Sequence, residues 1–313
     1  MAKATREAYG EALKKLAANN PDVVVLDADL SGSTKTAEFK KVAPERFFNV
    51  GIAEQDLIGT AAGMAIAGKI PFASSFAMFA AGRAFEIIRN TVAYPKLNVK
   101  IAATHAGLTV GEDGASHQAI EDISLMRSIP NMTVINPSDS IEAEQAVLKA
   151  AEMKGPVYIR LGRMAVDNVY GQDYKFELGK GVELKKGNDV TIIATGLMVQ
   201  EALKASEELS GEGINARVIN IHTIKPIDEE IIINAARETK AIVTAEEHSI
   251  IGGLGSAVLE ALSDKHPVPV KRIGVLDTFG ESGKPADLLE KYHLTAKDIQ
   301  EACKEVIKLK NIK

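Results

Sequence analysis

The sequence has 313 residues, 46% hydrophobic and 25% charged, and this composition excludes a disordered chain because it supplies enough apolar side chains for a core. The net charge of −5 and the pI of about 5.8 exclude the basic surface that nucleic-acid binding needs. A single cysteine, Cys303, excludes an internal disulfide network and a cysteine zinc cluster.

The N-terminus lacks the apolar segment of a secretory signal. The longest uncharged apolar stretches, residues 57–68 and 70–82, are separated by Lys69, and each is shorter than the roughly 20 residues that a membrane span needs. We therefore expect a soluble, cytoplasmic protein that binds neither membranes nor nucleic acid.

In the first half of the chain, short β-rich runs alternate with segments of helical periodicity. Tyr9, Leu13 and Leu16 share one face of a helix that Pro21 stops. Strands are expected at residues 23–26, 70–73, 99–103, 133–136 and 157–161. Helices are expected at residues 52–67, 82–93 and 140–153, the last with Ser140 as its N-terminal cap.

The periodicity then lapses, and residues 166–187 are expected to form a linker with one edge strand. From residue 188 the alternation resumes, with strands expected at residues 190–195, 216–221, 241–245 and 268–273. Helices are expected at residues 198–209, 228–238, 254–262 and 295–309. The sequence therefore predicts two open α/β domains with mainly parallel sheets, at residues 1–165 and 188–313.

Ligands of such sheets bind beyond the carboxyl ends of the strands, so we expect the functional residues on the loops that follow those ends. The first of these loops carries Asp27 and Asp29. Because side chains alternate along a strand, the two carboxylates are expected to face the same way, where they could bind sugar hydroxyls or phosphate. Turn formation is the other interpretation, because Asp, Ser and Gly favour turns.

Glu54 follows Gly-Ile-Ala and opens an unusually apolar helix. An acid in the first turn complements the helix dipole, but a carboxyl group in an apolar site can also share a proton with a heterocyclic nitrogen. Phe76 and Phe79 lie three residues apart. They either pack in the core or form a stacking surface for a planar ring.

Residues 104–118 hold His105 and His117, two of the six histidines, together with several glycines. Their spacing fits no standard zinc ligand set, and no metal site is expected in this chain. Because histidine titrates near neutrality, we expect a loop that transfers protons and binds hydroxyl groups. Solvation of the two histidines on an exposed loop is the alternative.

Two arginines and one glycine-rich loop are further candidates. Arg163 follows a strand end, where a guanidinium group could hold phosphate, and Arg6 lies near the start of the first helix. Residues 246–256 resemble an anion-binding loop that opens a helix, but their glycine order favours a packing or interface loop. No chemical role is expected for His222, His266, His293 and Cys303.

Taken together, four segments resemble transketolase, specifically its pyrimidine-binding and C-terminal domains, over essentially the whole chain. They are Asp-Leu-Ser at Asp29, Ala-Glu-Gln at Glu54, Ser-Phe-Ala-Met-Phe-Ala-Ala-Gly through Phe76 and Phe79, and Gly-Glu-Asp-Gly-Ala-Ser-His-Gln at residues 111–118. The last segment is specific, whereas Ala-Glu-Gln is shared among related thiamine-diphosphate enzymes.

The resemblance implies a position for the cofactor thiamine diphosphate. Glu54 would hydrogen-bond a ring nitrogen of its aminopyrimidine, and Phe76 and Phe79 would stack around that ring. Where family members often have a third aromatic residue, this chain has Ala73. Asp29 would contact the substrate or help to position the cofactor.

The resemblance also implies the substrate contacts of a reaction that moves a two-carbon ketol unit from a ketose phosphate to an aldose phosphate, in the non-oxidative pentose phosphate pathway. Asp113 would bind a substrate hydroxyl, and His117 would assist proton transfer. The family's ligands for the substrate phosphate match Arg6, Ser33, His105 and Arg163.

Transketolase binds the diphosphate and its divalent metal through a Gly-Asp-Gly…Asn motif, and this sequence contains no Gly-Asp-Gly. The resemblance therefore implies the C-terminal subunit of a split transketolase, inactive alone. A separate N-terminal subunit would bind the diphosphate and Mg²⁺. Because the pyrimidine site must face a diphosphate site on another domain, we expect a dimer of heterodimers.

Three alternatives stay open. Ala-Glu-Gln also suits a 1-deoxyxylulose-5-phosphate synthase half or the β subunit of a 2-oxoacid dehydrogenase, although Ser-His-Gln after Gly-Glu-Asp-Gly favours transketolase over the dehydrogenase type. A non-catalytic regulatory partner would keep the fold without turnover. The joint presence of Glu54, Asp113 and His117 argues against this last interpretation.

Overall fold

Buried strands form the centre of the first sheet. The computed structural model describes residues 2–310, and in it β2 (Val23–Asp27), with the sequence Val-Val-Val-Leu-Asp, is buried along its whole length. Such continuous apolar runs are typical of parallel strands that are covered on both faces.

The first sheet has seven strands in the order β12-β6-β7-β5-β4-β2-β3. All neighbouring strands are parallel except β12, which is antiparallel to β6. Besides β2, the strands are β3 (Phe47–Asn49), β4 (Ile70–Phe76), β5 (Lys100–Thr104), β6 (Thr133–Ile135), β7 (Val157–Arg160) and β12 (Thr223–Lys225).

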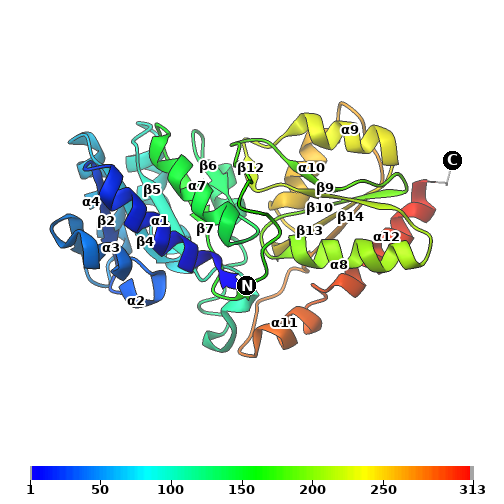
Figure 1. Cartoon of the computed structure of the whole chain (residues 1–313), viewed down its shortest axis with the longest axis horizontal. Coiled ribbons are helices and arrows are strands. Elements are labelled where there is room, and N and C mark those ends of the chain that lie inside the picture. The colour runs from blue at the N-terminus through cyan, green and yellow to red at the C-terminus, as the bar shows by residue number, and fades with distance from the viewer. Residues whose placement is uncertain (1, 311–313) are drawn as a thin grey trace.

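Helices cover both faces of this sheet (Figure 1). One face packs against α1 (Thr5–Asn19), α3 (Ala37–Val42) and α7 (Ser140–Glu152). The other packs against α4 (Glu54–Ile66), α5 (Phe85–Ile87) and α6 (Asp122–Ser128). Short helical turns complete the domain: α2 (Ser31–Thr34), η1 (Pro44–Arg46), η2 (Met78–Arg83), η3 (Ile88–Ala93) and η4 (Leu108–Asp113).

The second sheet has the order β14-β13-β10-β11-β9 and is parallel except for the edge strand β9. Its strands are β9 (Val182–Lys185), β10 (Val190–Ala194), β11 (Ala216–Asn220), β13 (Ile242–Ser249) and β14 (Val270–Val275). The helices that pack around it are α8 (Met198–Gly211), α9 (Glu229–Thr239), α10 (Leu254–Leu262), α11 (Pro285–Lys291) and α12 (Ala296–Lys310). Two mainly parallel α/β sheets confirm the predicted fold class.

Two strand pairs tie distant parts of the chain together. β12 comes from the second half of the sequence, yet it extends the first sheet. β1 (Lys3–Ala4) pairs with β8 (Ala165–Val166), so the start of the chain holds the start of the predicted linker. The predicted domain boundaries stay a prediction. In the described part of the chain, no helix is long and apolar enough to cross a membrane.

Three predicted elements differ from the structure. The single helix expected at residues 82–93 is instead two π-helical turns, η2 and η3, on either side of α5. β4 continues through Phe76, because Ser74 and Ser75 are buried between neighbouring strands despite their polarity. β13 continues to Ser249, so the start of the predicted glycine loop lies in a strand.

The prediction that Ser140 caps α7 is wrong, because Asp139 fills that position. The Asp139 Oδ1 accepts a hydrogen bond from the Glu142 amide at 2.8 Å. Its Oδ2 accepts two more, from the amides of Val169 at 2.6 Å and Tyr170 at 2.9 Å. One buried carboxylate therefore caps the helix and anchors the predicted linker, whereas the Ser140 hydroxyl donates to the Asn168 side chain.

Replacing Asp139 by Ala leaves three backbone amides without their acceptor, so we expect a loss of about 2–4 kcal/mol in the free energy of unfolding. Ser140→Ala, the control at the neighbouring position, removes one hydrogen bond and should cost less than about 1.5 kcal/mol. Urea denaturation of the two variants measures both values. Equal losses would contradict the assignment of the cap to Asp139.

Candidate active site

The predicted site residues lie where the parallel strands of the first sheet end. Asp29 follows β2, Glu54 opens α4 after β3, Phe76 ends β4, His105 follows β5, and Arg163 follows β7. Because parallel strands end at the same edge of a sheet, residues that are far apart in the sequence come together there.

Four rings contact one another at this edge. The ring centre of Phe76 lies 3.9 Å from that of His105 and 6.1 Å from that of Phe79. The His117 ring stands edge-on to Phe79, with the ring centres 5.1 Å apart. Phe76 is buried and Phe79 half-buried. The structure thus joins the predicted aromatic pair to the two histidines of the loop.

Glu54 is buried, at 1% exposure, in the first turn of α4. Its Oε2 accepts a hydrogen bond from Arg83 Nη1 at 2.6 Å. Its Oε1 accepts a long one, at 3.4 Å, from the hydroxyl of Ser75. A buried carboxylate with one strong partner keeps acceptor capacity for a second donor.

Arg83 is a site residue that the sequence reasoning missed. Its guanidinium carbon lies 4.8 Å from the centre of the Phe79 ring, so this side chain links the ring to the Glu54 carboxylate. Its side chain is 49% exposed. The available signal was that Arg83 is the first charged residue after Lys69, at the end of a long uncharged stretch.

A cationic corner is formed by Arg6 and Arg163. Arg6 Nη1 donates to the backbone carbonyl of Ser33 at 2.8 Å, while its buried Nε has no partner among the described residues. Burial lowers the pKa of Arg6, and the charge of Arg163 lowers it further, against the opposing effect of Glu7. Two cationic groups close enough to repel, one with a free donor, suit an anionic ligand.

His105 lies in this corner with a left-handed backbone, at φ +58°. Its Nε2 is 3.5 Å from Arg6 Nη1, and its Nδ1 is 2.9 Å from the Thr104 hydroxyl. Since a guanidinium only donates, Nε2 accepts and Nδ1 carries the proton. Burial, and then the charges of Arg6 and Arg163, lower the pKa of His105 to about 3.

The loop between β5 and α6 carries the other predicted substrate residues. Asp113 ends the 3₁₀-helix η4 and is exposed. His117 is half-buried beside Phe79, and its Nδ1 lies 2.9 Å from the Ser116 hydroxyl. Arg163 donates to the Val110 carbonyl and, at 3.3 Å, to Glu112, so it also contacts this loop.

The prediction that Asp27 and Asp29 face the same way is wrong. The strand ends at Asp27, and Asp29 has a positive φ of +64°, so the alternation of side chains does not continue. The buried Asp27 accepts hydrogen bonds from Thr34, Thr36 and the Leu30 amide, and burial raises its pKa. Asp29 is exposed, and its carboxylate accepts from Asn49.

The glycine loop of the second domain binds an internal anion. The Glu246 carboxylate accepts hydrogen bonds from the amides of Leu254 and Gly255, at the N-terminus of α10. These amides are therefore satisfied within the domain, as a packing loop requires. His222 and Cys303 are buried, and burial raises the pKa of the Cys303 thiol to about 12.

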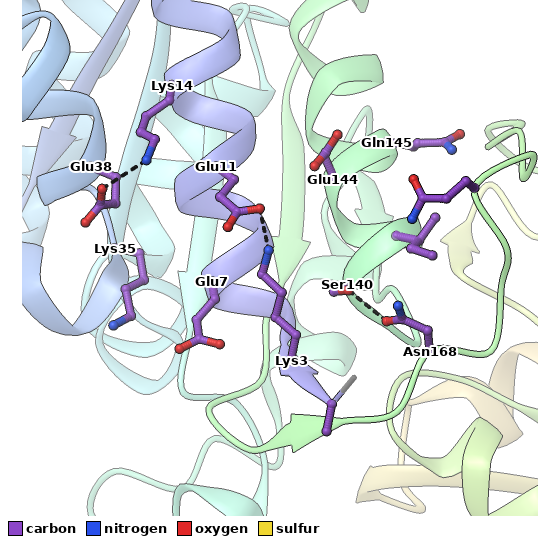
Figure 2. A pocket seen from close by; sticks show the side chains of 13 residues that line it. Lys3, Glu7, Glu11, Lys14, Lys35, Glu38, Ser140, Glu144, Gln145 and Asn168 are labelled. Carbon is purple, nitrogen blue, oxygen red and sulfur yellow. Dashed lines mark hydrogen bonds and ion pairs between the residues drawn. The ribbon is translucent and has the colours of Figure 1, made fainter.

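A cavity of about 820 Å³ lies between α1, α7 and the predicted linker (Figure 2). None of the predicted site residues lines it, and four of its charged side chains form two ion pairs, Lys3 with Glu11 and Lys14 with Glu38. Within residues 2–310, no group of three or more His, Cys, Asp or Glu side chains could hold a metal ion.

The low pKa of His105 predicts a pH-dependent stability. The unfolded chain gains a proton on this ring below its ordinary pKa of 6.5, and the folded chain gains it near 3. The stability that the neutral ring provides is therefore lost as the pH falls. Between pH 7 and pH 4.5, wild type should lose about 2 kcal/mol more than His105→Gln in urea denaturation. If the difference in free energy of unfolding between wild type and His105→Gln is the same at both pH values, this prediction is wrong.

Arg83→Met removes the main partner of the Glu54 carboxylate, and we expect the free energy of unfolding to fall by about 2–3 kcal/mol. In Arg83→Met/Glu54→Gln the unpaired charge is gone, so part of the loss should be recovered. Arg89→Met, a control at an exposed arginine, should cost less than about 0.5 kcal/mol. Additive losses in the double variant would show that the two side chains are not coupled.

Comparisons with known proteins agree with this geometry. Residues 1–168 match the family described as transketolase, pyrimidine binding domain, and residues 179–299 match transketolase, C-terminal domain. A Methanocaldococcus jannaschii protein named as a transketolase C-terminal section is 55% identical over 98% of this chain and 97% of its own length.

Two further relatives cover nearly all of the chain. The 6-deoxy-6-sulfo-D-fructose transketolase subunit SqwH of Clostridium sp. is 46% identical over 98% of this chain and 96% of its own length. A solved structure titled split gene transketolase, inactive beta4 tetramer, is 60% identical, with a TM-score of 0.93 over 98% of this chain and 99% of that chain. The chain belongs to the transketolase family and spans its pyrimidine-binding and C-terminal domains.

Proposed function

We propose that this chain is the C-terminal subunit of a split transketolase, which transfers a two-carbon ketol unit from a ketose phosphate to an aldose phosphate. The observation that carries the proposal is that one sheet edge holds both a buried carboxylate beside two phenylalanine rings and a cationic corner. The first suits an aminopyrimidine, and the second suits the phosphate of a sugar.

Thiamine diphosphate would supply a stabilised carbanion, which is the chemistry that protein side chains lack. The residues at this sheet edge fit its pyrimidine end. Glu54 has acceptor capacity for a hydrogen bond from a protonated ring nitrogen, with which it would share that proton, and Phe76 and Phe79 offer ring faces for stacking. Asp29 lies on the neighbouring loop, where its exposed carboxylate can help to position cofactor or substrate.

The cationic corner would hold the substrate phosphate away from the reacting carbon. Arg6 and Arg163 supply charge, and Ser33 lies next to Arg6. His105 lies beside Arg6 and accepts from its guanidinium at Nε2, so it would help to orient that group toward the phosphate. Binding at this distant point orients the substrate, while Asp113 and His117 bind its hydroxyls and move protons.

A second polypeptide completes the site in this proposal. No Gly-Asp-Gly occurs in the sequence, so the diphosphate and Mg²⁺ would be bound mainly by an N-terminal subunit, in a dimer of heterodimers. The relative whose title describes an inactive tetramer of β subunits supports the expectation that the chain alone does not turn over.

The test compares the chain alone with the chain plus an N-terminal subunit, thiamine diphosphate and Mg²⁺. We expect ketol transfer only in the complete mixture. In the assembled enzyme, Glu54→Gln should lower kcat by about 100-fold or more. Asp56→Asn, a control in the same helical turn, should leave it nearly unchanged. Robust activity of the chain alone refutes the split assembly, and normal turnover of Glu54→Gln removes that carboxylate from the mechanism.

The substrate separates the remaining alternatives. Xylulose 5-phosphate should be turned over, whereas pyruvate should be the donor for a 1-deoxyxylulose-5-phosphate synthase half or a 2-oxoacid dehydrogenase subunit. 6-Deoxy-6-sulfo-D-fructose belongs in the same assay, because a relative is named for that substrate and paired guanidinium groups also bind sulfonate. If titration calorimetry of the assembled complex detects no thiamine diphosphate binding, the non-catalytic regulatory partner is the better description.

A further inference from the structure

A side chain of the second domain reaches the loop that carries Asp113 and His117. Glu247 lies in β13 and is buried, at 4% exposure. Its Oε1 accepts a hydrogen bond from the backbone amide of Thr109 at 2.6 Å, across 138 residues of sequence. The contact connects two domains through a charged acceptor, the stronger kind of hydrogen bond.

The backbone of the loop is shaped to admit this carboxylate. Gly107 has a φ of +82°, and a Cβ at this position would fall on the carboxyl group of Glu247. Only glycine combines easy access to a positive φ with the absence of a Cβ that would collide with this carboxyl group. The loop therefore leaves β5 over the Glu247 carboxylate and enters η4 directly after it.

The second domain also holds the far side of the same loop. Gln118 Nε2 donates to the Glu281 carbonyl at 2.9 Å, as well as to the carbonyls of Leu108 and Gly111 within the loop. The Ser282 hydroxyl donates to the Glu112 carbonyl at 2.5 Å. The segment that presents Asp113 is thus fixed between β13 and the residues before α11.

The charge of Glu247 has a nearby counterpart. Arg160 of β7 donates to the Glu247 carbonyl at 2.9 Å and to the Asp122 carboxylate at 2.8 Å. Burial raises the pKa of Glu247 to about 7, and the charge of Arg160 opposes this rise. Arg160 is therefore the cationic group that offsets part of the cost of burying this carboxyl group at the domain contact.

We propose that Glu247 is a positioning residue for ketol transfer, which holds the Thr109 amide and thereby fixes the loop that presents Asp113 and His117 to the substrate. The inference rests on the proposed function. It assigns to the second domain a direct part in substrate binding, through a residue that does not touch the substrate.

The neighbouring residue offers a matched control. Glu246 is also a buried glutamate of β13, and burial raises its pKa to about 7 as well. Its carboxylate accepts hydrogen bonds from the N-terminus of α10 inside the second domain, and among residues 2–310 it makes no hydrogen bond to the loop. Glu246→Ala therefore removes two hydrogen bonds from amides and Glu247→Ala removes one, but only Glu247→Ala releases the loop.

The experiment measures steady-state kinetics of the assembled enzyme for wild type, Glu247→Ala, Glu247→Gln and Glu246→Ala. Glu247→Ala should raise KM for the ketose phosphate by about ten-fold, because the loop loses a charged acceptor. Thiamine diphosphate affinity should stay within about two-fold, since Glu54 and Phe79 lie on other elements. Glu247→Gln keeps an acceptor oxygen and should recover most of the loss, while Glu246→Ala should leave KM unchanged.

Hydrogen exchange of the isolated chain separates this inference from the proposed function. In Glu247→Ala, exchange over residues 107–118 should rise by about ten-fold or more, and Glu246→Ala should accelerate exchange only near α10. Faster exchange over residues 107–118 in Glu247→Ala would support the positioning of the loop even if the assembled enzyme shows no ketol transfer. In that case only the proposed function would be wrong. Unchanged exchange over residues 107–118, or an equal rise in KM for Glu246→Ala, would overturn the positioning role.

Discussion

The parallel register of the seven-stranded sheet is the constraint on which the site depends. β2, β3, β4, β5 and β7 all run in the same direction, so their carboxyl ends and the loops that follow them lie along one edge. Helices bury both faces of the sheet, and that burial keeps the edge rigid. Groups that are far apart in the sequence, such as Arg6 and His105 with a separation of 99 residues, Phe76 and His117, or Arg163 and η4, can then act as one surface.

The strands and the motifs could be predicted from the sequence because their signals are local. A short β-branched run such as Val-Val-Val-Leu favours a buried strand, and the order of residues 111–118 is specific to one family. The left-handed turn at Asp29 and the π-helical turns around Phe85 were not foreseen. They depend on packing between segments, which no short window of sequence contains.

Contacts between side chains that are far apart in the sequence could not be predicted, for the same reason. The sequence shows Arg83 as a single charge at the end of an apolar stretch. Its ion pair with Glu54 depends on how η2 places it after β4, and the sequence does not show that placement. Glu246 and Glu247 are adjacent glutamates, yet Glu246 accepts a hydrogen bond within the second domain and Glu247 accepts one from the first domain. Because side chains alternate along β13, the two glutamates point to opposite sides of the strand. This difference can be predicted only when the strand is known to continue to Ser249.

The central claim is that this polypeptide supplies the pyrimidine half of a thiamine diphosphate site whose other half lies on a second polypeptide. A structure of the chain in complex with a chain that carries Gly-Asp-Gly…Asn, determined with thiamine diphosphate and Mg²⁺, tests it most directly. We predict a distance below about 3.2 Å between the Glu54 carboxylate and a nitrogen of the aminopyrimidine ring. A bound pyrimidine remote from Glu54, with that carboxylate still enclosed by protein, would contradict it.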